Sequence, residues 1–100
     1  MSSLHSDTID NLFKGILKLE TVEECYRFFE DVCTIKEIQD ISQRFEVAGL
    51  LRKGENYNNI SKETGASTAT ISRVNKCLLY GADGYNLVFD RMSGKDAENA

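Results

Sequence analysis

Apolar residues recur every three or four positions along most of this 100-residue chain. That spacing places side chains on one face of an α-helix, so the pattern predicts a series of helices joined by short polar turns. The predicted helical segments are 4–19, 21–32, 34–53, 57–64, 67–81 and 84–92. The chain contains no proline, which fits uninterrupted helices and argues against a turn-rich all-β design. We therefore expect an all-α fold of six helices.

Capping residues mark where these helices begin and end. A threonine followed three positions later by a glutamate is the pattern of a capping box. It occurs at Thr21–Glu24 and at Thr34–Glu37. Glycine ends helices because it adopts the left-handed backbone at low cost, and Gly54 follows two basic residues that favour a helix C-terminus. The other expected caps and ends are Asn56, Gly65, Ser67 and Gly81.

The predicted helix at 34–53 is apolar on two sides. One stripe contains positions 38, 41, 45 and 48, and the other contains positions 47, 50 and 51. A helix with two apolar sides packs against more than one neighbour, so it is central to the fold. The two preceding helices contain more apolar side chains than this helix can cover. We therefore expect them to cover each other across a two-fold homodimer.

Length and composition describe a globular chain. With 41% hydrophobic and 28% charged residues, the sequence is not that of a disordered protein. A length of 100 residues allows one domain, which we place at 1–92. The segment 93–100 has no apolar anchor beyond alanine, and we expect it to be a flexible tail.

The sequence argues against a membrane segment, a metal site and a disulfide framework. It has no run of about 18 apolar residues and no basic-then-apolar signal pattern at its N-terminus, so we expect a cytoplasmic protein. Cys25, Cys33 and Cys77 form no Cys-x-x-Cys pair, and His5 is the single histidine. We expect no metal ligands, and reduced cysteines that pack as small apolar side chains.

The segment 57–79 has the pattern of a helix-turn-helix. Gly65 lies between two short predicted helices, as the tight turn of this motif requires. Ser61 is small enough to let the two helices approach closely. The positions expected between them are Ile60, Thr64, Ala66, Ile71 and Val74, of which the threonine fits least well. A plain helical hairpin explains the apolar positions equally well, so the outward residues must distinguish the two.

The outward side chains of the second helix favour DNA binding. A surface helix that serves stability usually contains glutamate and lysine, whereas this one begins with short hydroxyl side chains and one arginine. Short side chains let a helix lie deep in the major groove, where hydroxyls bond phosphates or base edges and methyl groups contact thymine. The outward residues are Ser67, Thr68, Ala69, Thr70, Ser72 and Arg73.

Charge is distributed unevenly along the chain. The formal net charge is −4, yet the segment 52–76 has an excess of three positive charges and residues 1–40 have an excess of five negative charges. On charge alone we add Lys62 and Lys76 to the expected DNA contacts. The alternative is that the uneven distribution of charge arose by chance and that both lysines are simply solvated.

A set of residues across the long helix and the helix-turn-helix forms a further pattern. It comprises Thr34, Arg44, the run LLRKGE at 50–55, Gly65–Ala66, the run ATISR at 69–73, and Asn75. This set resembles the Trp repressor family, most closely its YerC/YecD-like branch. The resemblance implies an intertwined homodimer with two helix-turn-helix motifs in successive major grooves of double-stranded DNA. It also implies DNA contacts at Asn58, Asn59, Ser61, Ser67, Thr68, Ala69, Thr70 and Ser72.

The effector pocket of that family corresponds to Thr34, Arg44, Arg73, Val74 and Cys77, which implies L-tryptophan or another small corepressor as ligand. Two positions depart from the family pattern, since valine stands where the repressor has glycine and cysteine where it has serine. The valine occupies space that the indole ring needs, and a thiol is a weak hydrogen-bond partner. We therefore expect Arg44 and Arg73 to contact phosphates or acidic neighbours. The alternative is that these two arginines bind a small anion other than tryptophan.

We interpret the sequence as a sequence-specific DNA-binding transcriptional regulator that acts as a dimer. The alternative is a helical protein–protein interaction module with a vestigial DNA-binding face. A third interpretation is the DNA-binding end of a transposase. An enzyme is disfavoured because no G-x-S-x-G or phosphate-loop motif occurs, and we expect no catalytic residue.

Overall fold

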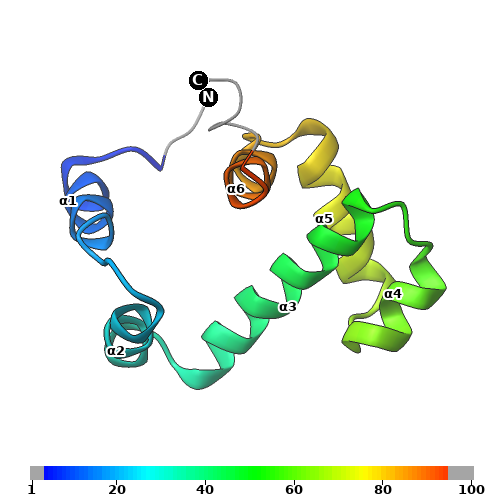
Figure 1. Ribbon diagram of the computed structural model, residues 1–100, viewed down its shortest axis with the longest axis horizontal. Coiled ribbons are helices and arrows are strands. Elements are labelled where there is room, and N and C mark those ends of the chain that lie inside the picture. Colours follow the sequence, from blue (N-terminus) through cyan, green and yellow to red (C-terminus); the bar gives the residue numbers. More distant parts are fainter. Residues whose placement is uncertain (1–3, 95–100) are drawn as a thin grey trace. The chain divides into compact units, whose positions relative to one another are not determined.

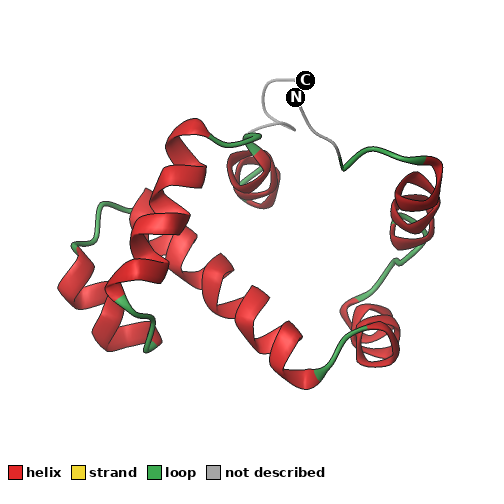
Figure 2. Ribbon diagram, turned by 180° about the vertical axis from the view of Figure 1, so that it is seen from behind, coloured by secondary structure: helices red, strands yellow, loops and turns green. Residues whose placement is uncertain are grey.

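The computed structural model describes residues 4–94, and every regular element in that range is an α-helix (Figures 1 and 2). The helices are α1 (Asp7–Ile16), α2 (Val22–Val32), α3 (Ile35–Arg52), α4 (Tyr57–Thr64), α5 (Thr68–Tyr80) and α6 (Gly84–Met92). The predicted all-α fold of six helices is confirmed. The tail predicted at 93–100 lies outside the described residues beyond Gly94.

The first helix is shorter than its apolar pattern predicted. The stripe at 4–19 suggested one continuous helix, but α1 is preceded by the cap Ser6, whose Oγ accepts from Ile9 N at 3.1 Å. That bond satisfies one of the free N–H groups at the start of the helix and so fixes where it begins. Gly15 in the last turn lowers the helix propensity, and the last two leucines of the stripe fall outside the helix.

Both predicted capping threonines are used, with one difference between them. At the start of α3, Glu37 N donates to Thr34 Oγ1 at 3.1 Å and Thr34 N donates to Glu37 Oε1 at 2.8 Å, so this capping box is reciprocal as predicted. At α2, Glu24 N donates to Thr21 Oγ1 at 3.0 Å. The Glu24 carboxylate, however, accepts from Glu20 N at 2.8 Å, one residue before the cap.

The end of α3 has the geometry that glycine allows. Gly54 has a φ of +89°, in the left-handed region. Glu55 N donates to Leu50 O at 3.1 Å and Gly54 N donates to Leu51 O at 3.0 Å, which are the two bonds of a Schellman motif. The predicted helix end is therefore confirmed, and the chain passes directly to Asn56, the cap of α4.

The chain divides into two compact units, Met1–Ile38 and Gln39–Ala100. In the first unit, α1 and α2 are amphipathic, yet neither helix has a buried residue. Leu17, Val22 and Tyr26 are each at least 60% exposed. Most helical stability in proteins comes from packing of the apolar face, so these two helices lack a core of their own.

The second unit has a small apolar core, formed where α4 and α5 lie against the C-terminal half of α3 (Figure 1). Its residues, each at most 2% exposed, are Val47, Ala48, Ile60, Ala66, Ile71 and Val74. Each of the two stripes predicted on α3 therefore contributes one buried residue. Ile41, from the longer stripe, remains 51% exposed.

Aromatic rings attach α6 to α3. Phe89 stacks on Phe45 with ring centroids 4.6 Å apart, and Tyr85 lies beside Phe89 at 6.5 Å. Arg52, at the end of α3, pairs with Asp90 at 2.9 Å, and its guanidinium carbon lies 5.3 Å from the centre of the Phe89 ring. These contacts connect α6 to α3 although α6 contains no fully buried residue.

Candidate nucleic-acid interface

Gly65 forms the turn of the helix-turn-helix. Its φ of +75° lies in the left-handed region that residues with a side chain rarely adopt. Its N–H closes α4 by donating to Ser61 O at 2.9 Å. Ser67 then caps α5 by accepting from Thr70 N at 3.1 Å. The motif predicted at 57–79 is therefore present, with a tight turn between α4 and α5.

Two hydroxyl side chains stabilise this turn from inside. Thr64 Oγ1 donates to Ile60 O at 2.7 Å and accepts from Ala66 N at 3.1 Å. Thr64 is therefore tolerated at a position where the pattern favoured an apolar residue, because its hydroxyl both donates and accepts a hydrogen bond. Ser61 Oγ donates to Ala66 O at 2.9 Å. Ser61 was also a predicted DNA contact, but its half-buried hydroxyl is committed to the turn.

The first turns of α5 present short side chains to solvent. The exposed residues here are Ser67, Thr68, Ala69, Ser72 and Arg73, as predicted. Thr70 is half-buried, and Ser67 Oγ donates to Thr70 Oγ1 at 3.1 Å. The first turn of α5 contains no acidic residue, so its backbone N–H groups and positive dipole end face solvent without a competing carboxylate on that turn.

The other predicted contacts also lie on the surface of this motif. Asn58, Asn59 and Lys62 are exposed on α4, and Lys76 is exposed on α5. Asn59 Nδ2 donates to Glu55 Oε1 at 3.3 Å, which orients this amide toward the preceding loop. The predicted contact residues therefore share one motif.

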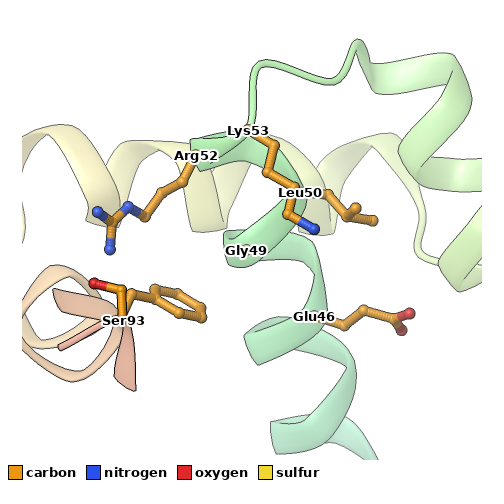
Figure 3. Close-up of a pocket in the computed structure, with 7 residues that line it drawn as sticks. Glu46, Gly49, Leu50, Arg52, Lys53 and Ser93 are labelled. Carbon is orange, nitrogen blue, oxygen red and sulfur yellow. The ribbon is translucent and has the colours of Figure 1, made fainter. Parts of the chain in front are cut away.

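One basic residue counted with this motif is paired elsewhere. Arg52 bonds Asp90 of α6 at 2.9 Å, and Figure 3 shows it reaching toward α6 near Ser93 while Glu46 points away. Glu46, Arg52 and Ser93 border a mostly apolar hollow of about 510 Å³ between α3 and α6. Because Asp90 lies outside the segment 52–76, the local excess of positive charge effectively falls from three to two.

The residues that correspond to the family's effector pocket lie in different environments. Val74 is 2% exposed and packs inside the helix-turn-helix core. Arg44 and Arg73 are exposed, and Thr34 belongs to the other unit. Cys77 borders a mostly apolar hollow of about 380 Å³ formed by residues of α3, the end of α5 and α6. Val74 therefore serves packing within the helix-turn-helix core.

The prediction that the cysteines pack as small apolar side chains is wrong for two of the three. Cys25 and Cys77 are exposed, and Cys33 is half-buried. Cys25 is exposed because it lies on α2, which has no buried residue. Within residues 4–94, no group of three or more His, Cys, Asp or Glu side chains could hold a metal ion. None of the described helices is long and apolar enough to cross a bilayer.

Sequence reasoning missed Gln43. This residue of α3 is half-buried, and its Nε2 donates to Thr64 O at 3.1 Å, across 21 positions of sequence. The sequence pattern does not indicate this contact. Gln39 is the same residue type one turn earlier on the same helix, yet it is exposed. Only the packing of α3 against α4 distinguishes the two residues.

Comparison with known proteins extends over most of the chain. The sequence profile of the family described as Trp repressor protein matches residues 7–93. The uncharacterized protein YerC of Bacillus subtilis strain 168 is 52% identical over 100 residues, which cover 100% of this chain and 96% of YerC. The resemblance to the YerC-like branch is thereby confirmed.

Two solved structures show the same fold. The crystal structure of a TrpR-like protein from Eubacterium eligens ATCC 27750 has a TM-score of 0.87 at 56% identity, covering 90% of this chain and 93% of that one. A Staphylococcus aureus protein classed with the Trp repressors has a TM-score of 0.87 at 51% identity, covering 90% of each chain. By sequence and by fold, this chain belongs to the Trp repressor family.

Proposed function

We propose that this protein is a sequence-specific DNA-binding transcriptional regulator that acts as a homodimer through its helix-turn-helix. The Trp repressor family is regulatory rather than enzymatic, which supports a DNA-binding regulator as the kind of function. The observation that carries the proposal is the exposed start of α5, where hydroxyl and methyl side chains stand in place of the glutamates and lysines of an ordinary surface helix.

This surface suits the major groove of DNA. Thr68 and Ser72 expose short hydroxyl side chains that can bond base edges or phosphates, and Ala69 exposes a methyl group that can contact thymine. Arg73 and Lys76 are exposed further along α5, where they can bind phosphates. The hydroxyl bonds inside the turn hold α4 against α5, so the surface is arranged before DNA arrives.

The homodimer is supported by the apolar surface that a single chain leaves uncovered. Neither α1 nor α2 has a buried residue, and on α6 the side chains of Leu87, Val88 and Met92 are at least 43% exposed. Exposed apolar area of this extent marks an interaction surface. A second copy that covers these helices would make residues 1–92 a single domain, as the sequence predicts.

Light scattering coupled to gel filtration tests the dimer directly. At micromolar concentration we expect a mass of twice the 11.3 kDa of one chain. Replacing the exposed Leu17 with aspartate should shift the mass toward that of one chain. In the dimer interface the new carboxylate would be buried without a positive charge or hydrogen-bond donor to pair with it. A wild-type mass of 11.3 kDa at these concentrations contradicts the dimer.

Selection of bound duplexes from a random pool tests the function. We expect enrichment of two-fold symmetric sequences whose half-sites lie about 34–36 Å apart, or a multiple of that spacing. The affinity of the selected duplex should fall linearly with salt on logarithmic axes, because phosphate contacts release counterions. Repeating the selection with free L-tryptophan should leave the affinity unchanged, since Val74 and Cys77 replace the glycine and serine of the family's effector pocket. No enrichment and no salt dependence would instead indicate a protein-interaction module.

A further inference from the structure

We propose that Gln43 is a positioning residue that fixes the angle of the helix-turn-helix on α3, and thereby the half-site spacing that the dimer prefers. The inference rests on the function proposed above and begins with one contact. Gln43 Nε2 donates to Thr64 O at 3.1 Å in a partly buried setting. This bond joins the central helix to the motif that is expected to contact DNA.

The position of the accepting carbonyl gives the bond its importance. Thr64 is the last residue of α4, and carbonyl groups at a helix C-terminus have no partner within the helix. The turn at Gly65 follows at once, so the bond holds the chain at the pivot between α4 and α5. The hydroxyl bonds of Ser61 and Thr64 act only within the motif and do not orient it relative to α3.

The contacts that surround this bond are mainly apolar. Val47 and Ala48 of α3 belong to the same cluster as Ile60 and Ile71 of the motif. Packing of these side chains favours a crossing angle between α3 and the motif but leaves a spread of about 15–20° around it. A hydrogen bond depends on both distance and angle, and its half-buried site shields it from competing water. Gln43 therefore adds a directional restraint at the pivot, which narrows the range of angles that the apolar core allows.

In a dimer, the angle of each motif on its own α3 determines where the two copies of α5 meet the duplex. A restraint at this pivot sharpens the preference for one half-site spacing. Loss of the restraint lets each motif rotate, which weakens binding at the best spacing and improves tolerance of neighbouring spacings. The readout is therefore a ratio of affinities, which a general loss of stability would not change.

The test compares full-length variants on duplexes with the selected spacing and with spacings one base pair shorter and longer. At the best spacing, Gln43→Leu should lose about fivefold in affinity for each motif, which is the effect of one hydrogen bond. At the shorter and longer spacings it should lose much less. Gln43→Lys keeps a donor of similar reach and should restore the wild-type ratio, although its charge raises every affinity. Gln39→Leu is the matched control at an exposed position of the same helix.

A second measurement needs no DNA. Amide hydrogen exchange at Gly65 and Ala66 should accelerate about fivefold in Gln43→Leu relative to Gln39→Leu, because the pivot opens more often. An unchanged spacing ratio in Gln43→Leu, or unchanged exchange at the turn, overturns the proposal. If the wild-type protein binds no duplex, the proposed function fails, whereas the exchange measurement still decides whether Gln43 restrains the turn.

Discussion

Replacing Ala69 with aspartate will reduce affinity for the selected duplex by at least about 100-fold, because the new carboxylate faces the groove and its phosphates, and like-charge juxtaposition costs several kcal/mol. The fold should tolerate the change. Ala69 is exposed in the first turn of α5, where acidic side chains interact favourably with the helix dipole and none is present. Fluorescence anisotropy with labelled duplex measures the loss, and circular dichroism measures the fold.

The matched control for this variant is Ala69→Asn, which has nearly the same shape without the charge. We expect it to lose less than about tenfold, the cost of one unfavourable base contact. If Ala69→Asp binds the duplex as tightly as the wild type while remaining folded, the exposed start of α5 is not the DNA-binding surface. The same variant should leave the mass of the dimer unchanged.

Truncating Ile71 to alanine will have the largest effect on stability. Ile71 has no exposed surface and lies in the core between α3, α4 and α5. Removing three buried carbon atoms loses their transfer free energy and leaves a cavity, so we expect the free energy of unfolding to fall by about 2–4 kcal/mol. Urea unfolding at a fixed protein concentration measures the change through the midpoint and slope.

The neighbouring Ser72→Ala variant provides the comparison. Ser72 is exposed on the same helix, so its truncation should change the free energy of unfolding by less than about 0.5 kcal/mol. A loss below about 1 kcal/mol in Ile71→Ala would show that the site is loosely packed. That result would also remove the basis for a rigid helix-turn-helix surface.

The boundaries of the helices could largely be predicted from sequence because they depend on local interactions. The box at Thr34 and Glu37 and the left-handed glycines at 54 and 65 each act within a few residues. The helix predicted at 4–19 was too long, because the apolar spacing continues past the positions where Ser6 and Gly15 limit the helix. Periodicity reports which face is apolar, whereas caps and glycines decide how long that face remains helical.

The candidate site could be predicted only in part, because several of its contacts join distant segments. The turn and the exposed start of α5 follow from residues close together in sequence. The pairing of Arg52 with Asp90 across 38 positions does not, so charge counting overstated the positive charge of the motif. The hydroxyl of Thr64 could not be assigned as bonded before the positions of Ile60 O and Ala66 N were known.

The lack of buried residues in α1 and α2 has a consequence for how such a regulator responds to its own abundance. If a second chain completes the fold of these helices, the folded fraction depends on total protein concentration. Where separate chains predominate, halving the supply of protein lowers the dimer concentration about fourfold. Occupancy of a DNA site then follows synthesis more steeply than it would for a one-chain regulator, so control of expression is sharpened before any effector acts.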